Sequence, residues 1–139
     1  MSVVRAEIPI TIVEGGTFNL TFTWETGTPF TPVDLTGFDA RMQVRAKLKD
    51  LLPILDLKAE ATPWEPDLPL GIYLYDSDAV PDDKGKYRIY ISDEDTKGIC
   101  AAHKQIDGVY DLFLYNTEGE AVFQQYGSAT LIPSVTRDE

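Results

Sequence analysis

Apolar and polar residues alternate with a period of two through most of this 139-residue sequence. Between residues 17 and 24, large apolar side chains occupy every second position: Phe18, Leu20, Phe22 and Trp24. Because successive side chains of a β-strand point to opposite faces, this pattern predicts a strand with one apolar and one polar face. Helical spacing is not sustained over ten residues anywhere, so the sequence predicts an all-β protein.

A second alternating segment, residues 39–49, carries unusual charge. Its expected inward positions are all apolar: Ala40, Met42, Val44, Ala46 and Leu48. Its expected outward positions hold four of the twelve basic residues of the chain: Arg41, Arg45, Lys47 and Lys49. The segment is therefore predicted to be one strand with a basic outer face.

About eight strands are expected in all, in a single domain spanning residues 1–139. They are Ile8–Val13, Thr17–Trp24, Asp39–Lys49, Ile54–Glu60, Ile72–Tyr75, Lys86–Ser92, Gly108–Asn116 and Ala121–Val135. Gly15 and Gly16 predict a hairpin or a tight corner between the first two strands. One helical turn is expected from Ser92 toward Gly98 or His103. These features predict an antiparallel β-sandwich, immunoglobulin-like or jelly-roll-like, with a small barrel as the alternative.

Charge and composition exclude several classes of function. Twenty-three acidic and twelve basic residues give a net charge of −11, which opposes binding to nucleic acid or to anionic membranes. The sequence contains no run of about 20 apolar residues and no signal-peptide pattern, so a soluble, unexported protein is expected. The single cysteine cannot form an intramolecular disulfide, which fits either synthesis in a reducing compartment or indifference to redox conditions.

Residues suited to catalysis or metal binding are few. Cys100 and His103 could touch on a helical turn, but Cys100 between Ile99 and two alanines is better interpreted as a small buried residue. One cysteine and one histidine cannot supply the four ligands of a structural zinc site. The acidic residues between Asp76 and Asp83 do not follow the EF-hand spacing, and we interpret them as a solvated turn, with a weak cation site as the alternative. No catalytic residue, metal or cofactor is predicted, and small-molecule ligands are not expected.

Other features suit contacts with proteins. The basic stripe could be a solvated strand face, or it could meet an acidic surface on a neighbouring copy or a partner. Trp64, among prolines that recur at every third position, is either a lid or an exposed anchor. The candidate interface residues are Arg41, Arg45, Lys47, Lys49 and Trp64. Trp64 together with outward tyrosines among Tyr73, Tyr75, Tyr87 and Tyr90 also leaves open a carbohydrate-binding module, and a hydrolase built on carboxylates is a third alternative.

Several stretches taken together resemble a family of small structural proteins of tailed bacteriophages. They are GGTFNLTFTW (15–24), PVDLTGFDARMQVR (32–45), GKYRIYISDEDT (85–96), GVYDLFLYNTEG (108–119) and GSATLIPSVTR (127–137). The pattern covers most of the chain and is similar to the amino-terminal domain of phage baseplate upper proteins. Each motif alone is ordinary strand and turn chemistry, so the order and spacing of the motifs carry the resemblance.

The resemblance implies an immunoglobulin-like β-sandwich that attaches to a tail or neck ring or displays another component. The chain lacks the long helical extension with which baseplate upper proteins carry receptor-binding proteins. We therefore expect a compact, non-enzymatic virion protein: a head–tail adaptor, a tail, baseplate or neck ring subunit, or a capsid decoration. It would be synthesised in the bacterial host cytoplasm, and its partners would be other virion proteins and copies of itself.

Overall fold

A computed structural model describes residues 4–27, 29, 31–60, 69–74, 85–100 and 103–134. The strands of this part of the chain are β1 (Val4–Glu7), β2 (Ile10–Val13), β3 (Phe18–Thr23), β4 (Glu25–Thr26), β5 (Thr31–Pro32), β6 (Asp39–Arg45), β7 (Leu55–Glu60), β8 (Gly71–Leu74), β9 (Lys86–Ile91), β10 (Ile106–Tyr115) and β11 (Ala121–Ile132). The helix is α1 (Asp93–Thr96). The all-β prediction is confirmed.

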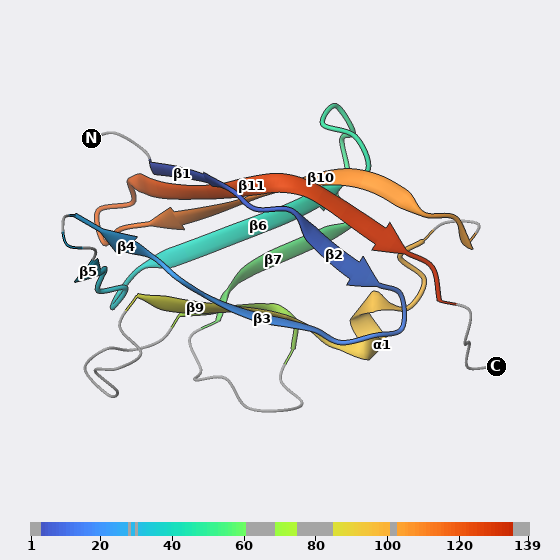
Figure 1. The fold of residues 1–139 in the computed structure, drawn as a ribbon, viewed down its shortest axis with the longest axis horizontal. Coiled ribbons are helices and arrows are strands. Elements are labelled where there is room, and N and C mark those ends of the chain that lie inside the picture. The colour runs from blue at the N-terminus through green and yellow to red at the C-terminus, as the bar shows by residue number, and fades with distance from the viewer. Residues whose placement is uncertain are drawn as a thin grey trace.

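The main strands form one curled, mixed sheet (Figure 1). Its order is β1-β11-β10-β6-β7-β8-β9-β3, and β2 pairs with a later part of β11. The predicted antiparallel pairing is wrong for three contacts, because β1 and β2 both run parallel to β11 and β7 runs parallel to β8. The strands also form a continuous sheet instead of two separate ones, while β4 and β5 make a small ribbon of their own.

The sheet curls at β7, which belongs to both of its halves. Residues 55–58 of β7 pair with β6, whereas Ala59 and Glu60 pair with β8. The curl brings β9 and the end of β3 opposite β11, so that the two halves enclose the core. Aromatic rings meet across it: the ring centroids of Trp24 and Phe123 lie 5.0 Å apart, and those of Tyr87 and Phe123 lie 6.3 Å apart.

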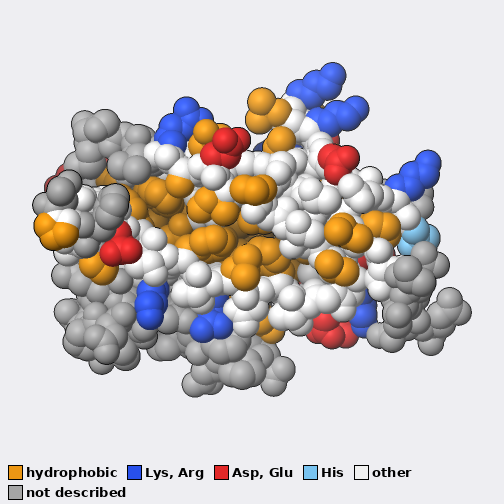
Figure 2. All heavy atoms as spheres, viewed as in Figure 1, with side chains coloured by type: hydrophobic (Ala, Val, Ile, Leu, Met, Phe, Trp, Pro, Cys, Tyr) orange, Lys and Arg blue, Asp and Glu red, His pale blue; other side chains and the backbone are white. Residues whose placement is uncertain are grey.

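The predicted alternation is realised in the central strands. Residues 40, 42 and 44 of β6 are buried, as are residues 110, 112 and 114 of β10. Along the predicted strand 17–24, Phe18 of β3 and Trp24 just after it are buried, but Leu20 is 45% exposed. The curled sheet does not close at this point, and Figure 2 shows apolar side chains along the opening between β3 and β1–β2.

The segment between β2 and β3 is a corner and not a hairpin. β2 pairs with β11 and β3 pairs with β9, so residues 14–16 carry the chain from one half of the sheet to the other. Gly15 has φ 81°, and its N–H donates to Thr96 Oγ1 at 3.0 Å. Thr96 Oγ1 in turn donates to the Gly16 carbonyl at 2.8 Å, which fixes the corner to α1.

The helical turn begins where the sequence predicts it. Ser92 caps α1, because its Oγ accepts a hydrogen bond from the Asp95 N–H at 3.3 Å. The helix ends at Thr96, short of the predicted Gly98 or His103. No helix within the described residues is long and apolar enough to cross a bilayer.

Candidate protein-binding face

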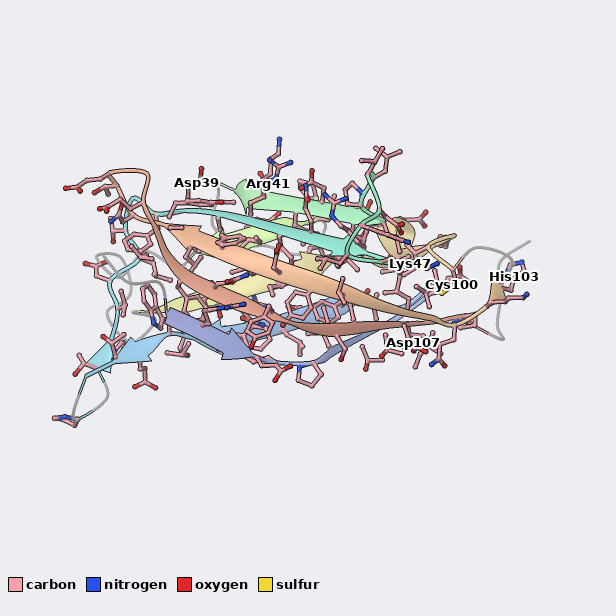
Figure 3. All side chains as sticks on the ribbon, turned by 90° about the horizontal axis from the view of Figure 1, so that it is seen from above. Asp39, Arg41, Lys47, Cys100, His103 and Asp107 are labelled. Atoms are coloured by element: carbon pink, nitrogen blue, oxygen red, sulfur yellow. The ribbon has the colours of Figure 1, made fainter. Side chains whose placement is uncertain are left out.

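We call the side of β1, β2, β11, β10, β6 and residues 55–58 of β7 that points away from the core the outer face. Figure 3 looks onto it, with Asp39, Arg41 and Asp107 labelled. The strand register brings its side chains into rows: Asp111 lies between Gln43 and Tyr126. Residues distant in the sequence thus share one surface, which joins both ends of the described chain to its middle.

Arg41 lies on the outer face as predicted, and there it forms an ion pair. Its Nε donates to Asp56 Oδ1 at 3.2 Å, and its terminal nitrogen donates to Asp56 Oδ2 at 2.9 Å. This bidentate contact raises the pKa of Arg41 and lowers the pKa of Asp56. Both side chains remain accessible, so the pair orders the surface without removing it from a partner's reach.

Arg45 is also on this face, but its guanidinium holds the chain that follows β6. It donates to the Asp50 carbonyl at 2.6 Å and to Gln43 Oε1 at 2.7 Å. The backbone N–H of Lys47 donates to Asp50 Oδ2 at 3.1 Å, and the Asp50 N–H donates back to the Lys47 carbonyl at 3.0 Å. These local hydrogen bonds offer the backbone an alternative to the sheet, and β6 ends at Arg45.

The predicted strand 39–49 is therefore wrong beyond residue 45. Residues 46–54, which we call the β6–β7 loop, rise above the outer face (Figure 1). Lys47 and Lys49 lie on this loop and not on a strand. Leu48, predicted to face inward, is 84% exposed, and Leu51 and Leu52 are 92% and 82% exposed. Figure 2 shows basic and apolar side chains gathered on this projection.

A hollow of about 600 Å³ lies beside the loop on the outer face. Its lining includes Arg5, Glu7, Leu48, Val109, Asp111 and Tyr126. The guanidinium of Arg5 lies 4.9 Å from the centroid of the Tyr126 ring, a cation–π contact. Burial raises the pKa of Asp111, although Arg45 acts in the opposite direction. The hollow thus combines an apolar wall with carboxylates and a stacked arginine.

The outer face and the β6–β7 loop have an unusual charge for this chain. Within the described residues they hold six cations: Arg5, Arg41, Arg45, Lys47, Lys49 and Lys58. They hold an equal number of carboxylates: Glu7, Asp39, Asp50, Asp56, Asp107 and Asp111. This surface is formally neutral, whereas the described residues outside it hold nine carboxylates and four basic side chains.

Three of the four tyrosines considered for carbohydrate binding do not form an exposed platform. Tyr73, Tyr87 and Tyr90 are all buried, with 2%, 2% and 8% of their surface exposed. The outer face carries partly exposed aromatic side chains of its own, and there the rings of Phe113 and Tyr115 stack with centroids 6.1 Å apart. Three further predictions, Trp64, Tyr75 and the acidic segment from Asp76 to Asp83, fall outside the described residues.

Cys100 and His103 meet a third ionisable residue, Glu14, at one end of the molecule (Figure 3). Glu14 Oε2 accepts a hydrogen bond from the Cys100 N–H at 3.1 Å, and its other oxygen lies 3.9 Å from His103 Nδ1. Burial and the Glu14 carboxylate raise the pKa of the Cys100 thiol, the reverse of what a thiolate nucleophile needs. Cys100 is buried, as predicted, and this cluster anchors the corner after β2.

The sequence did not point to the hollow or to the exposed leucines. The hollow needs β1 and β11 to lie beside β10 and β6, a pairing that no local pattern announces. A signal for the leucines was present, because Leu51 and Leu52 follow Asp50 and precede Pro53, and a turn at Asp50 would have ended the alternation.

Comparison with known proteins does not identify a family for this chain. No protein family matches the sequence, and a search of curated proteins finds no relative. Among the described residues, no three ionisable or cysteine side chains gather in a way that could hold a metal ion. The outer face and the resemblance of the sequence motifs are therefore the two features of this protein that bear on its function.

Proposed function

We propose that this protein is a non-enzymatic structural protein of a bacteriophage virion that assembles with other virion proteins through its outer face. It would serve as an adaptor or ring subunit of the tail, baseplate or neck, or as a decoration of the capsid. The observation that carries the assembly role is the neutral outer face of a chain with net charge −11. The resemblance to small tailed-phage proteins supplies the setting.

The strand order supports the finer proposal that the curled sheet is an immunoglobulin-like sandwich of the variable type. Taken in chain order, β3, β6, β7, β8, β9, β10 and β11 would correspond to strands B, C, C′, D, E, F and G. The variable type places C′ beside C in the sheet that also holds F and G, which matches the order β11-β10-β6-β7. In that frame the outer face is the outside of the sheet that holds G, F, C and C′.

The side chains of the outer face support a role in binding proteins. Interfaces between proteins are enriched in aromatic residues and arginine. The outer face carries Arg5, Arg41 and Arg45 together with Phe113, Tyr115 and Tyr126, and its charges balance. Elsewhere the excess of carboxylates keeps the protein soluble and opposes adhesion to packaged DNA.

Quantitative mass spectrometry of gradient-purified particles, scaled to the major capsid protein, tests the virion role. We expect the protein in particles: a few to a few dozen copies would indicate a ring, since ring symmetry limits the number, and hundreds would indicate a capsid decoration. Absence from particles of a culture that expresses the protein would overturn the proposal. A glycan-binding screen would then test the carbohydrate alternative, for which the hollow with Tyr126, Arg5 and Asp111 is the available site.

A further inference from the structure

The β6–β7 loop presents apolar side chains in a fixed geometry. Leu48, Leu51 and Leu52 are each more than four-fifths exposed, although leucine is normally among the most buried residues. Hydrogen bonds from Arg45 and within the turn at Asp50 hold the loop in place. A loop that is already ordered loses little entropy when it binds, so its leucines are suited to act as anchors in a partner.

A receptor of matching chemistry lies on the same face. The hollow beside the loop offers Val109 and the ring of Tyr126 as apolar contacts, and its charged lining consists of the carboxylates Glu7 and Asp111 and the arginines Arg5 and Arg45. The loop brings two lysines, Lys47 and Lys49, alongside its leucines. The loop of one molecule therefore complements the hollow of another in apolar character, and Glu7 and Asp111 are the groups of the hollow with which its lysines can pair.

Charge also selects which surfaces two copies can bring together. Outside the outer face and its loop the described residues hold nine carboxylates and four basic side chains, so contacts between those surfaces repel. The neutral outer face is the surface over which two copies meet without this penalty. We infer that the outer face binds a second copy of this chain, with the β6–β7 loop of each copy seated in the hollow of the other.

The arrangement fixes the symmetry of the contact. The loop and the hollow lie side by side on one face, and Leu48 contributes to both. A two-fold axis that lies in the plane of the interface and passes between the loop and the hollow places each loop over the partner's hollow, which gives a closed dimer of the isologous kind. A contact between different faces would instead generate a ring or a filament. This inference rests on the assembly role proposed for the outer face, and it names the second copy as a partner.

The test uses the purified full-length protein, so that its failure is separate from absence in particles. Sedimentation velocity over a range of concentrations should show a monomer–dimer equilibrium. The double substitution Leu51→Asn with Leu52→Asn should raise the dimer dissociation constant at least about 100-fold, because it removes two apolar anchors from each copy. Ser128→Trp, which fills the hollow from an exposed position on its lining, should do the same.

Two controls make the outcome specific. Leu20→Asn changes an exposed leucine on β3, away from the outer face, and should leave the dimer intact. Mixing the loop variant with the hollow variant should restore a heterodimer, since one intact loop then meets one intact hollow. Circular dichroism melting identifies any variant that fails to fold.

Three results would overturn the inference. They are a protein that stays monomeric at millimolar concentration, a dimer indifferent to both loop and hollow variants, and open-ended polymers. Binding of the monomer through the same leucines to vesicles of phosphatidylcholine and phosphatidylglycerol would also overturn it, in favour of a membrane as the partner.

Discussion

Strands β10 and β11 carry polar side chains on both of their faces, and the two sets behave differently. On the inner side Tyr87 donates to Gln125 Oε1 at 2.5 Å, and Gln125 Nε2 donates to Tyr110 Oη at 3.0 Å. Tyr110 Oη donates to the Ile8 carbonyl at 2.5 Å. We call Tyr87, Gln125 and Tyr110 the core network. It is buried and continuous, whereas the outer face holds accessible, separately paired groups.

The difference shows how one sheet serves two purposes. The core network joins β9 in one half of the curled sheet to β11 and β10 in the other, and through Ile8 it holds the segment between β1 and β2. Buried polar groups with satisfied hydrogen bonds specify which surfaces meet, and they are costly to break. The outer groups stabilise little and remain available to a partner.

The sharpest test of this contrast compares adjacent residues on opposite faces of β11. Gln125→Leu removes the acceptor of the Tyr87 hydroxyl and the donor to Tyr110, and it should lower the free energy of unfolding by about 2–4 kcal/mol. Gln124→Leu, on the outer face, should change it by no more than about 0.5 kcal/mol. Urea unfolding followed by tryptophan fluorescence measures both. Equal effects would mean that the core network does not hold the two halves together.

A second test uses alkaline pH. Burial raises the pKa of both Tyr87 and Tyr110 above the usual value of about 10. Above pH 10 the unfolded chain releases protons that the folded protein retains, so the free energy of unfolding falls as the pH rises. Tyr87→Phe removes one such group, and it should reduce this fall by up to about 1.4 kcal/mol per pH unit.

The same pair of proteins supplies the control for the alkaline test. Between pH 7 and 9 the difference between Tyr87→Phe and the parent protein should stay constant, because the tyrosine hydroxyl keeps its proton in both states. A difference that already changes in this range, or identical slopes above pH 10, would show that Tyr87 is accessible to solvent.

The sequence predicted those features of the structure that depend on neighbouring residues, and it did not predict those that depend on contacts between distant segments. Alternation correctly placed Met42 and Val44 of β6 in the core and Arg41 outside, because side-chain direction in a strand is a local property. It failed at Leu48, where the Arg45 and Asp50 hydrogen bonds end the strand. It also failed at Leu20, whose burial would need the distant edge of β1–β2 to reach β3.

Strand order and the hollow depend on contacts between distant parts of the chain. The parallel pairing of β1 and β2 with β11 joins residues more than a hundred positions apart, and nothing in the local pattern of either segment specifies it. Of the predicted interface residues, Arg41, Arg45, Lys47 and Lys49 are all on or beside the outer face. The sequence did not show that Arg41 forms an ion pair, that Arg45 anchors the β6–β7 loop, or that Lys47 and Lys49 lie on that loop.

Replacing Asp111 tests whether a charged residue of the outer face lowers the free energy of unfolding. Because burial raises the pKa of this carboxyl group, its ionised form is disfavoured in the folded protein, and its contribution to stability falls as the pH rises through that pKa. Asp111→Asn should therefore raise the free energy of unfolding at pH 7, by less than about 1 kcal/mol since solvent screens the site. The gain should vanish at pH 3, and a gain that persists there would rule out the ionised form as its cause.

The smallest effect is expected at the ion pair of Arg41 and Asp56. Arg41 holds the pKa of Asp56 below its usual value, so the pair adds stability above pH 4 that is lost as the pH falls through the pKa of the folded protein. Asp56→Asn should make the acid side of the stability profile shallower in low salt, and 1 M NaCl should remove the difference by screening. An identical acid profile would mean that the pair does not persist in solution. Arg41 would then present its charge to a partner without first having to leave Asp56, and the outer face would remain formally neutral because the Asp56 carboxylate is exposed as well.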